Sequence, residues 1–477
     1  MRNKMHVLGR RFALALAVIT GLVGPGVLRP LSPTYAALTP LPDTTNNIHL
    51  AMAFNGEVPH TCNSSPYNCT PNYNPNNIEY VWGSGYQTEP AGVVNDVYMQ
   101  FDREPNNFTS MQTGLGFVNH PLSWFQANHP DWIEYKCDKT TVDTYDGQSN
   151  TPLDISNAGV LNYLWNTYYL PTLNLGFHGI AFDNVNVGNN HNRCGHYDLN
   201  GHWVQQFTGG RNDPAYIAAV TTWAQFMQQH VHALGKTVAY NYPFDPYVNA
   251  TDWMNLTQYM DIDFDECGFT VCDSVNPPYV TDSTWLNTMN AYAQLAQTKG
   301  WVSNNDEPDA QPNFSRSEIQ WVLANYLLMK GPHTFVWMTG PASNNYGHQA
   351  NLAEYSAPIG SATNSMYQSQ NVWMRDFSNG KAIVNPSSRA TYSISLPANT
   401  YKDLYGNAMN SVTLGPASGI VLLGTGTGPT TTPAPATATN TPATTSVPPT
   451  STPPPAPTAT RTTNSCTMWP CWPFLFM

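Results

Sequence analysis

The sequence GFHGIAFDNVNVGNN, residues 176–190, decides the fold. Its apolar run, residues 179–182, stops at Asp183, and the residues that follow are rich in Asn and Gly. This pattern predicts a buried parallel strand that ends at Asp183 and leads into a loop. Helix-like segments on both sides indicate β/α units. Because the strand ends of a (β/α)8 barrel carry the chemistry, Asp183 is the first candidate catalytic residue; the alternative is a capping or packing role.

Seven further segments have the length and pattern of strands. Those after Asp183 end in polar or acidic residues, which suits strand ends that meet at one barrel mouth. Residues 57–94, rich in Asn, Pro and Tyr, are expected to form a long loop. The expected strands are residues 48–55, 96–102, 132–138, 179–182, 237–242, 259–266, 301–307 and 333–339.

Helical patterns lie between several of these strands. Residues 213–234 carry an apolar stripe behind Pro214, and Gly235 suits the end of that helix. Residues 315–318, SRSE, form a capping box that opens a later helix. Shorter helices are expected over residues 154–170 and 285–298. The fold class is therefore α/β, a (β/α)8 TIM barrel, although no helix is evident between its first and third strands.

Changes in composition divide the chain into five parts. Basic residues followed by an apolar run and small residues predict a secretory signal peptide over residues 1–37. The barrel is placed at 38–367, and short strands with Gly and Asn turns predict a small all-β sandwich domain at 368–424. Residues 425–465 are Thr/Pro repeats, expected to form a disordered linker, and 466–477 form a short Cys/Trp tail.

Eight Cys residues in an exported chain suggest disulfides. Three pairs are close in sequence, Cys62 with Cys69, Cys267 with Cys272, and Cys466 with Cys471, which leaves Cys137 and Cys194 as a long-range pair. No spacing matches a zinc site, and in residues 191–196 the cysteine is better used as a disulfide partner. We therefore expect four disulfides, no metal and no cofactor.

The charge balance limits the partners. The net charge is −12 with only 19 Lys and Arg, which argues against a nucleic-acid partner on electrostatic grounds. The tail is too short to span a membrane. We expect a monomer that is secreted or held at the cell surface, with no membrane span in the mature chain.

Several motifs carry a resemblance to a known family. FHGIAFDN at 177–184, MDIDFDECG at 260–268 and NHPDW at 128–132 are similar to hypothetical glycosyl hydrolase family fifteen. That family belongs to the barrel superfamily of α-amylases and α-galactosidases. WMRDFSNGKAIVNP, YKDLYGN and ASGIVLL, within residues 373–423, resemble the small β-sandwich that follows such barrels. The resemblance implies a glycoside hydrolase that acts on an extracellular polysaccharide or oligosaccharide, with a retaining mechanism expected.

The resemblance also implies which residues react. The carboxylate that ends the fourth strand is the expected nucleophile, Asp183, and one at the end of the sixth strand is the expected acid/base, Glu266. Asp263 and Asp265 compete for the second role, and Glu266 also suits a cap for the loop at Cys267. Other strand-end residues are candidates for sugar contacts, with an ordinary loop or core role as the alternative for each. These substrate-binding candidates are Asp138, Asn184, Asn241, Tyr242, Asp265, Asn304 and Trp337.

A second, non-enzymatic function is also compatible with polar strand ends at the barrel mouth. A barrel of this kind that is displayed on a linker and performs no turnover would be a carbohydrate-binding protein. Carboxylates on strands four and six favour the enzyme, because glycoside cleavage needs one ionised and one protonated carboxyl group.

Overall fold

The structure is a computed structural model, and it describes most of the chain between residues 48 and 425. The predicted signal peptide, the linker and the Cys/Trp tail lie outside the described residues, as does the pair Cys267 and Cys272. The described ranges are 48–53, 60–64, 67–71, 78–105, 115–142, 151–242, 244, 250–266, 268–270, 279–306, 314–339 and 352–425.

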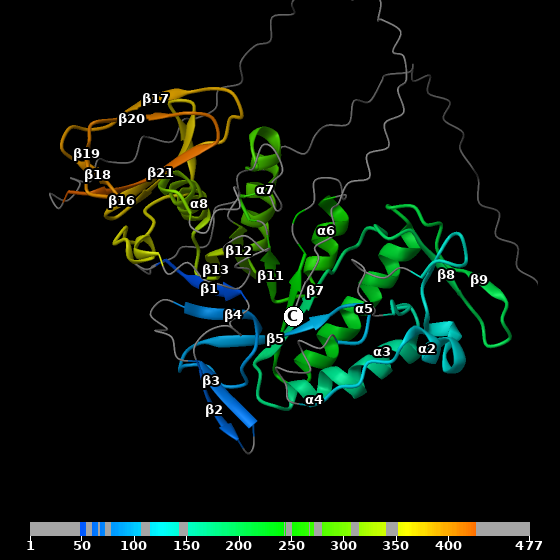
Figure 1. The fold of residues 1–477 in the computed structure, drawn as a ribbon. Helices are drawn as coiled ribbons and strands as arrows, with labels where there is room; N and C mark the ends of the chain where they lie inside the picture. Colours follow the sequence, from blue (N-terminus) through cyan, green and yellow to red (C-terminus); the bar gives the residue numbers. More distant parts are fainter. Residues whose placement is uncertain are drawn as a thin grey trace, which may run out of the picture. The chain divides into compact units, whose positions relative to one another are not determined.

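Eight parallel strands close into a barrel, so the predicted (β/α)8 TIM barrel is confirmed (Figure 1). Each strand pairs with its neighbour in chain order, and the last pairs with the first. The strands are β1 (Leu50–Ala53), β4 (Ile78–Ser84), β5 (Val94–Gln100), β7 (Gly179–Asp183), β10 (Thr237–Asn241), β11 (Ile262–Asp265), β12 (Gly300–Asp306) and β13 (Thr334–Thr339).

One predicted barrel strand was wrong, and one barrel strand was missed. The second barrel strand is β4, Ile78–Ser84, which the sequence had suggested was part of a long loop. The segment at 96–102 contains β5 and is the third strand. The segment at 132–138 is outside the barrel and contributes only the two-residue strand β6 (Tyr135–Lys136) to a small sheet. Because one strand was missed and another was added, β7 is still the fourth.

Helices follow the later strands, and local signals set their ends. The Asp213 carboxylate accepts hydrogen bonds from the first amides of α5, and Pro214 occupies the first turn. The capping box of Ser315 and Glu318 opens α8 as predicted. The predicted helix at 285–298 begins and ends three residues earlier, as α7. The helices are α3 (Ala158–Leu164), a π-helical turn (Trp165–Tyr169), α4 (Leu170–Leu173), α5 (Pro214–His232), α6 (Ala250–Thr257), α7 (Asp282–Leu295) and α8 (Arg316–Met329).

Aromatic rings and small residues fill the barrel interior. The rings of Trp82 and Phe264 stack across it with centroids 4.3 Å apart. Ala181 and Ala239 on the neighbouring strands leave room for them, as large and small residues must alternate where strands converge. Gly179 is required for the same reason, since a Cβ there would collide with the Asp96 carboxylate. The interior is therefore a solid core whose polar groups are concentrated near its ends.

Two long excursions lie beyond the ends of β5 and β7. The first contains α2 (Leu122–Asn128), a 3-10 turn (Pro130–Trp132) and β6, and the second contains β8 (Arg193–Tyr197) and β9 (Trp203–Gln205). Strands β6, β8 and β9 form one antiparallel sheet, and a disulfide joins Cys137 to Cys194, as predicted. The two excursions are therefore linked covalently on the same side of the barrel as Asp183.

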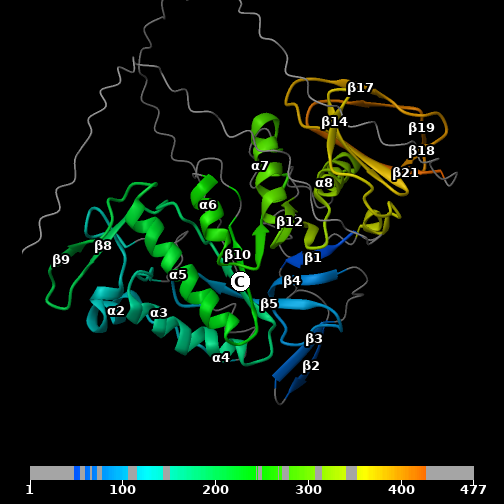
Figure 2. The same cartoon turned by 180° about the vertical axis from the view of Figure 1, so that it is seen from behind.

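An all-β domain follows the barrel, as predicted (Figure 2). Alternate residues of its strand β15 (Val372–Phe377) face in opposite directions. Trp373 packs its ring 5.7 Å from that of Trp285, and Arg375 donates to the Leu327 carbonyl of α8. Met374, on the other face, joins an apolar core with the two-stranded sheet. The six-stranded sheet is β14 (Tyr367–Ser369), β15 (Val372–Phe377), β16 (Gly380–Asn385), β21 (Ser418–Gly424), β18 (Tyr401–Asp403) and β19 (Ala408–Met409), and it packs on β17 (Tyr392–Ser395) and β20 (Ser411–Leu414).

In chain order, a hairpin of β2 (His60–Ser64) and β3 (Tyr67–Pro71) comes between the paired strands β1 and β4. Its register places Cys62 opposite Cys69, although the side chains of this pair are outside what the structure describes.

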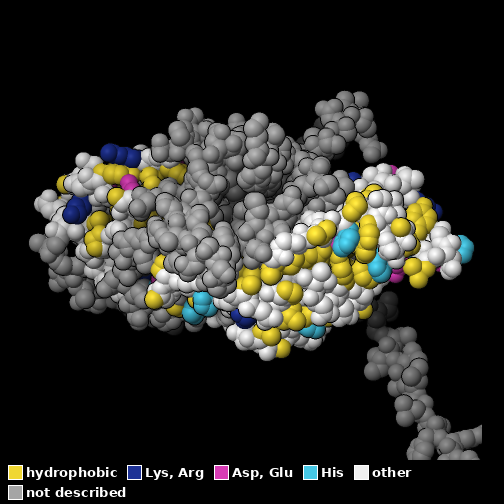
Figure 3. All heavy atoms as spheres, turned by 60° about the horizontal axis from the view of Figure 1, so that its bottom comes forward, with side chains coloured by type: hydrophobic (Ala, Val, Ile, Leu, Met, Phe, Trp, Pro, Cys, Tyr) yellow, Lys and Arg dark blue, Asp and Glu magenta, His cyan; other side chains and the backbone are white. Residues whose placement is uncertain are grey.

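The described part of the face in Figure 3 shows mainly hydrophobic and uncharged side chains, in keeping with a chain in which 10% of residues are charged. Among the described residues, no helix has both the length and the apolar character to cross a membrane.

Candidate active site

Asp183 ends β7 inside the barrel mouth and accepts hydrogen bonds on both carboxylate oxygens. The hydroxyl of Tyr98, on the neighbouring strand β5, donates to Oδ2 at 2.7 Å. The backbone amide and the side-chain amide of Asn184 donate at 2.8 Å and 2.9 Å. Asn184 has a φ of 60°, a left-handed conformation that Asn tolerates better than most residues. This turn directs both of its donors back onto the preceding carboxylate.

A single amide connects Asp183 to Glu266. Asn241 ends β10, which lies between β7 and β11 in the barrel. Its Nδ2 donates to Asp183 Oδ1 at 2.8 Å and to Glu266 Oε2 at 2.6 Å. The distance between these two oxygens therefore cannot exceed the sum of the two hydrogen-bond lengths. Three consecutive strands thus bring two carboxyl groups and one amide together.

Strand alternation decides which of the three acidic residues at β11 faces the mouth. Ile262 and Phe264 pair with residues of β10 that point into the barrel, and Glu266 continues the same face. Asp263 and Asp265 occupy the opposite face, toward the helices. Asp265 accepts from the Gly268 amide at 3.0 Å. Asp265, predicted both as a sugar contact and as the alternative acid/base, therefore faces away from the mouth.

Burial and hydrogen bonds act against each other on the pKa of Asp183. Burial raises this pKa, and donors from Tyr98 and Asn241 together with the charge of Arg103 limit the rise. Burial and the nearby Asp183 charge raise the pKa of Tyr98, so the phenol stays protonated and remains a donor. Asp102 is buried, but the guanidinium groups of Arg103 and Arg193 hold its pKa below the usual range.

Asn304 and Trp337 extend the mouth beside Glu266. They are paired in register on β12 and β13, on the same face as the interior residues Val302 and Phe335. Asn304 Nδ2 donates to the Glu266 carbonyl at 3.1 Å. The Asn304 Oδ1 and Trp337 Nε1 atoms are buried and have no hydrogen-bond partner within the described part of the chain.

Two predicted substrate contacts lie elsewhere. Asp138 does not end a barrel strand; it is exposed in a turn after β6, where its carboxylate accepts from the amides of Thr140 and Thr141. Tyr242 follows Asn241 and so faces the helix layer, where its ring stacks on Trp253 with centroids 6.3 Å apart. The structure thus brings together five predicted residues, Asp183, Asn184, Asn241, Glu266 and Asn304, with Trp337 at their edge.

Sequence reasoning missed two residues that act on Asp183, Tyr98 and Arg103. The available signal for Tyr98 was the alternation in residues 94–100, VNDVYMQ, whereas no pattern pointed to Arg103. The alternation places Asp96, Tyr98 and Gln100 on one face, and polar side chains on the inner face of a barrel strand indicate a site. Among the described residues, no group of three His, Cys, Asp or Glu side chains is arranged to hold a metal ion.

Comparison with known families identifies the barrel. The model of hypothetical glycosyl hydrolase family 15 matches residues 111–381, which is more than half of the chain. The chain belongs to this family. As a family member, it is a glycoside hydrolase by classification. The match includes β7, β10 and β11, the strands that carry the candidate site.

The similarity of this chain to solved structures is low in both sequence identity and TM-score. Eubacterium rectale Amy13B is 10% identical, covers 81% of this chain and 97% of its own, and has a TM-score of 0.40. Aspergillus fumigatus Ega3 in complex with galactosamine is 12% identical over 64% of this chain and 95% of its own, with a TM-score of 0.35. The glycoside hydrolase domain of PelA from Pseudomonas aeruginosa is 10% identical over 62% and 98%, with a TM-score of 0.34. A comparison with curated proteins gave no match.

Proposed function

We propose that the protein is a retaining glycoside hydrolase that cleaves an extracellular polysaccharide or oligosaccharide, with Asp183 as the nucleophile and Glu266 as the acid/base. The observation that carries this proposal is the shared donor Asn241, which limits the separation of the two carboxyl groups. This limit on the nearest oxygens supports a retaining pair, whose carboxyl groups are about 5–5.5 Å apart, over an inverting pair, which is roughly 6.5–9.5 Å apart and needs room for a water molecule.

In the first step, an Asp183 oxygen bonds to the anomeric carbon as the bond from that carbon to the leaving oxygen breaks. Glu266 transfers its proton to the leaving oxygen. Because Asn241 donates to Oε2 and a carbonyl oxygen is the better acceptor, the proton of neutral Glu266 belongs on Oε1. The hydrogen bonds from Tyr98 and Asn184 favour the ionised form of Asp183, which a nucleophile requires.

In the second step, Glu266, now a carboxylate, takes a proton from a water molecule. The water oxygen bonds to the anomeric carbon while the bond to Asp183 breaks, which restores both groups. Asn241 donates in both steps and needs no change of its own protonation state. It is a positioning residue that keeps the two carboxyl groups at a fixed distance.

We also propose that the protein acts outside the cell. The predicted signal peptide is the first support, and the disulfide between Cys137 and Cys194 is the second, because such bonds persist mainly in oxidising compartments. The net charge of −12 agrees better with a carbohydrate substrate than with a nucleic acid.

The test is hydrolysis by the wild-type chain on a panel of polysaccharides and aryl glycosides, with Asp183→Asn as the inactive counterpart. The two side chains have nearly the same shape, so the variant should fold and lose turnover. If a sugar binds but neither chain cleaves any member of the panel, the non-catalytic binding barrel is the better description.

A further inference from the structure

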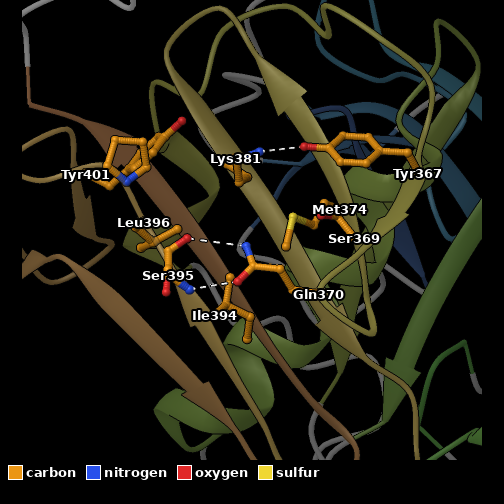
Figure 4. Close-up of a pocket in the computed structure, with 10 residues that line it drawn as sticks. Tyr367, Ser369, Gln370, Met374, Lys381, Ile394, Ser395, Leu396 and Tyr401 are labelled. Atoms are coloured by element: carbon orange, nitrogen blue, oxygen red, sulfur yellow. Dashed lines mark hydrogen bonds between the residues drawn. The ribbon is translucent and has the colours of Figure 1, made fainter. Parts of the chain in front are cut away.

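A pocket lies in the all-β domain, away from the barrel mouth. It has a volume of about 250 Å³ and opens between the six-stranded sheet and strand β17. Figure 4 shows Tyr367 and Tyr401 on opposite sides of it, with Lys381 between them. Met374 and Ile394 supply part of its apolar lining. The pocket therefore combines two aromatic rings with an aliphatic surface.

The sheet itself separates this pocket from the barrel. Trp373 and Arg375 of β15 contact the barrel side, through Trp285 and the carbonyls at the end of α8. Met374 lies between them in sequence and faces the opposite side, where the pocket opens. A ligand in this pocket therefore cannot touch Asp183 or Glu266, and the pocket is a site of its own.

Polar groups in the pocket remain available to a ligand. Within the described part of the chain, the hydroxyls of Tyr401 and Ser369 form no hydrogen bond. The Lys381 ammonium donates to the Tyr367 hydroxyl at 2.7 Å and to the Asp376 carboxylate, which uses two of its three donors. Two hydroxyls and one N–H thus lie beside the aromatic and aliphatic side chains, while the Gln370 amide, which also lines the pocket, is hydrogen-bonded to the Ser395 backbone.

The charge of the pocket is balanced. Lys381 is the one charged residue among those that line it, and its ion pair with Asp376 compensates that charge. An anionic ligand would have to compete with the Asp376 carboxylate. An uncharged ligand with hydroxyl groups on its edge and C–H groups on its faces fits both the balanced charge and the aromatic rings.

We propose that this pocket is a second carbohydrate site, which binds one neutral pyranose unit of a polysaccharide. The volume is below the about 300–1,000 Å³ of pockets for drug-sized ligands, which suits a single ring. The choice of sugar over other small polyols rests on the proposed function, because a glycoside hydrolase meets its polymer at high local concentration. A polymer held here stays near the barrel, and its effective concentration at the mouth rises.

The test is calorimetric titration of the full-length chain with maltohexaose, cellohexaose and xylohexaose. Oligogalacturonate serves as the anionic probe, and all chains carry Asp183→Asn so that nothing is hydrolysed. Tyr401→Ala removes one aromatic wall, and Ser369→Trp fills the pocket. Tyr392→Ala is the matched control, since Tyr392 is a half-buried tyrosine of the same domain that does not line the pocket.

We expect at least one neutral hexasaccharide to bind, with an affinity that falls about tenfold or more in both pocket variants and stays unchanged in the control. Binding that neither pocket variant weakens, or pocket-dependent binding of oligogalacturonate alone, overturns the proposal. So does the absence of binding in all four titrations.

Hydrolysis of small aryl glycosides separates this proposal from the proposed function. We expect Tyr401→Ala, made in the chain with Asp183 intact, to keep that hydrolysis. If the chain hydrolyses aryl glycosides but shows no pocket-dependent binding, only the proposal of a second carbohydrate site fails. Pocket-dependent binding in a chain that cleaves no glycoside defeats only the proposed function.

Discussion

Tyr98 and Asp183, on neighbouring strands of the barrel, form a 2.7 Å hydrogen bond in which the phenol donates to the carboxylate. This bond stabilises the charged form of Asp183 against the burial that raises its pKa. Tyr98→Phe should therefore raise that pKa further. We expect the acid limb of the kcat/KM profile to move up by about one pH unit, because hydrogen bonds to charged groups contribute about 1.5–3 kcal/mol.

Tyr80→Phe is the control for this shift. Tyr80 donates at 2.8 Å to Asp96, deeper in the same barrel, and has no hydrogen bond to Asp183. Its variant should leave the acid limb in place. If the acid limb stays in place in Tyr98→Phe as well, the Tyr98 hydroxyl does not lower the pKa of Asp183.

Asn241 is predicted to act through the geometry of the carboxyl pair. Asn241→Ala removes the donor shared by Asp183 and Glu266, and we expect kcat to fall by about 10²–10³ with a much smaller change in KM. Tyr242→Phe, at the adjacent residue that faces the helices, should keep normal kcat. Equal losses in the two variants, or a loss confined to KM, would contradict a positioning role for Asn241.

Glu266 and Asp265 are adjacent in sequence but face opposite sides of β11, so their variants should behave differently. Glu266→Gln should slow cleavage of glycosides with poor leaving groups far more than that of activated aryl glycosides, because only the former need a proton. Asp265→Asn should keep that selectivity normal and affect stability instead. Steady-state rates on a matched pair of substrates decide this, and the reverse pattern would transfer the acid/base role to Asp265.

Asp96 is predicted to make stability depend on pH. Burial raises its pKa to about 7, although Thr237 and Tyr80 donate to it. Because the folded pKa is above the unfolded value of about 3.9, the stability linked to its proton is fully present below about pH 4 and is lost as the pH rises through 7. Asp96→Asn removes this loss, which is on the order of 2–4 kcal/mol.

Thermal unfolding at pH 5 and pH 8.5 checks this prediction. The melting temperature of Asp96→Asn relative to wild type should be higher at pH 8.5 than at pH 5. Asp138→Asn is the control, because hydrogen bonds from Thr141 and Thr140 lower the pKa of this exposed group to about 2 and it stays ionised throughout that range. A difference between Asp96→Asn and wild type that is the same at both pH values would show that Asp96 does not titrate there.

The fourth to eighth barrel strands were predictable because each is a short apolar run that ends in polar residues. The strand Ile78–Ser84 was not, because it follows a stretch rich in Asn, Pro and Tyr that is typical of a loop. Trp132–Asp138 has a strand-like alternation, but those side chains pack in the excursion beyond β5 instead of the barrel. Local pattern does not reveal which sheet a strand joins, since long-range pairing decides that.

The candidate site was predictable only in part, because the sequence does not show which side chains at a strand end face the mouth. Residues at the end of a barrel strand alternate between the mouth and the helix layer, and a shift of one residue reverses the face. Asn241 and Glu266 face the mouth, whereas Tyr242 and Asp265, each one position away, face the helices. The sequence identifies the strand ends, but which alternate residues of a strand face the mouth becomes known only from its register with its neighbours.

The most direct test of the central claim is to identify the residue that carries the glycosyl group. An activated 2-fluoro glycoside of a sugar that the wild-type chain cleaves should form a covalent intermediate that hydrolyses slowly. Mass spectrometry of the digested protein should then find one sugar on the peptide that contains Asp183, and none in Asp183→Asn. A sugar on a different residue, or cleavage with inversion at the anomeric carbon and no labelled peptide, would contradict the assignment of Asp183 and Glu266 as a retaining pair.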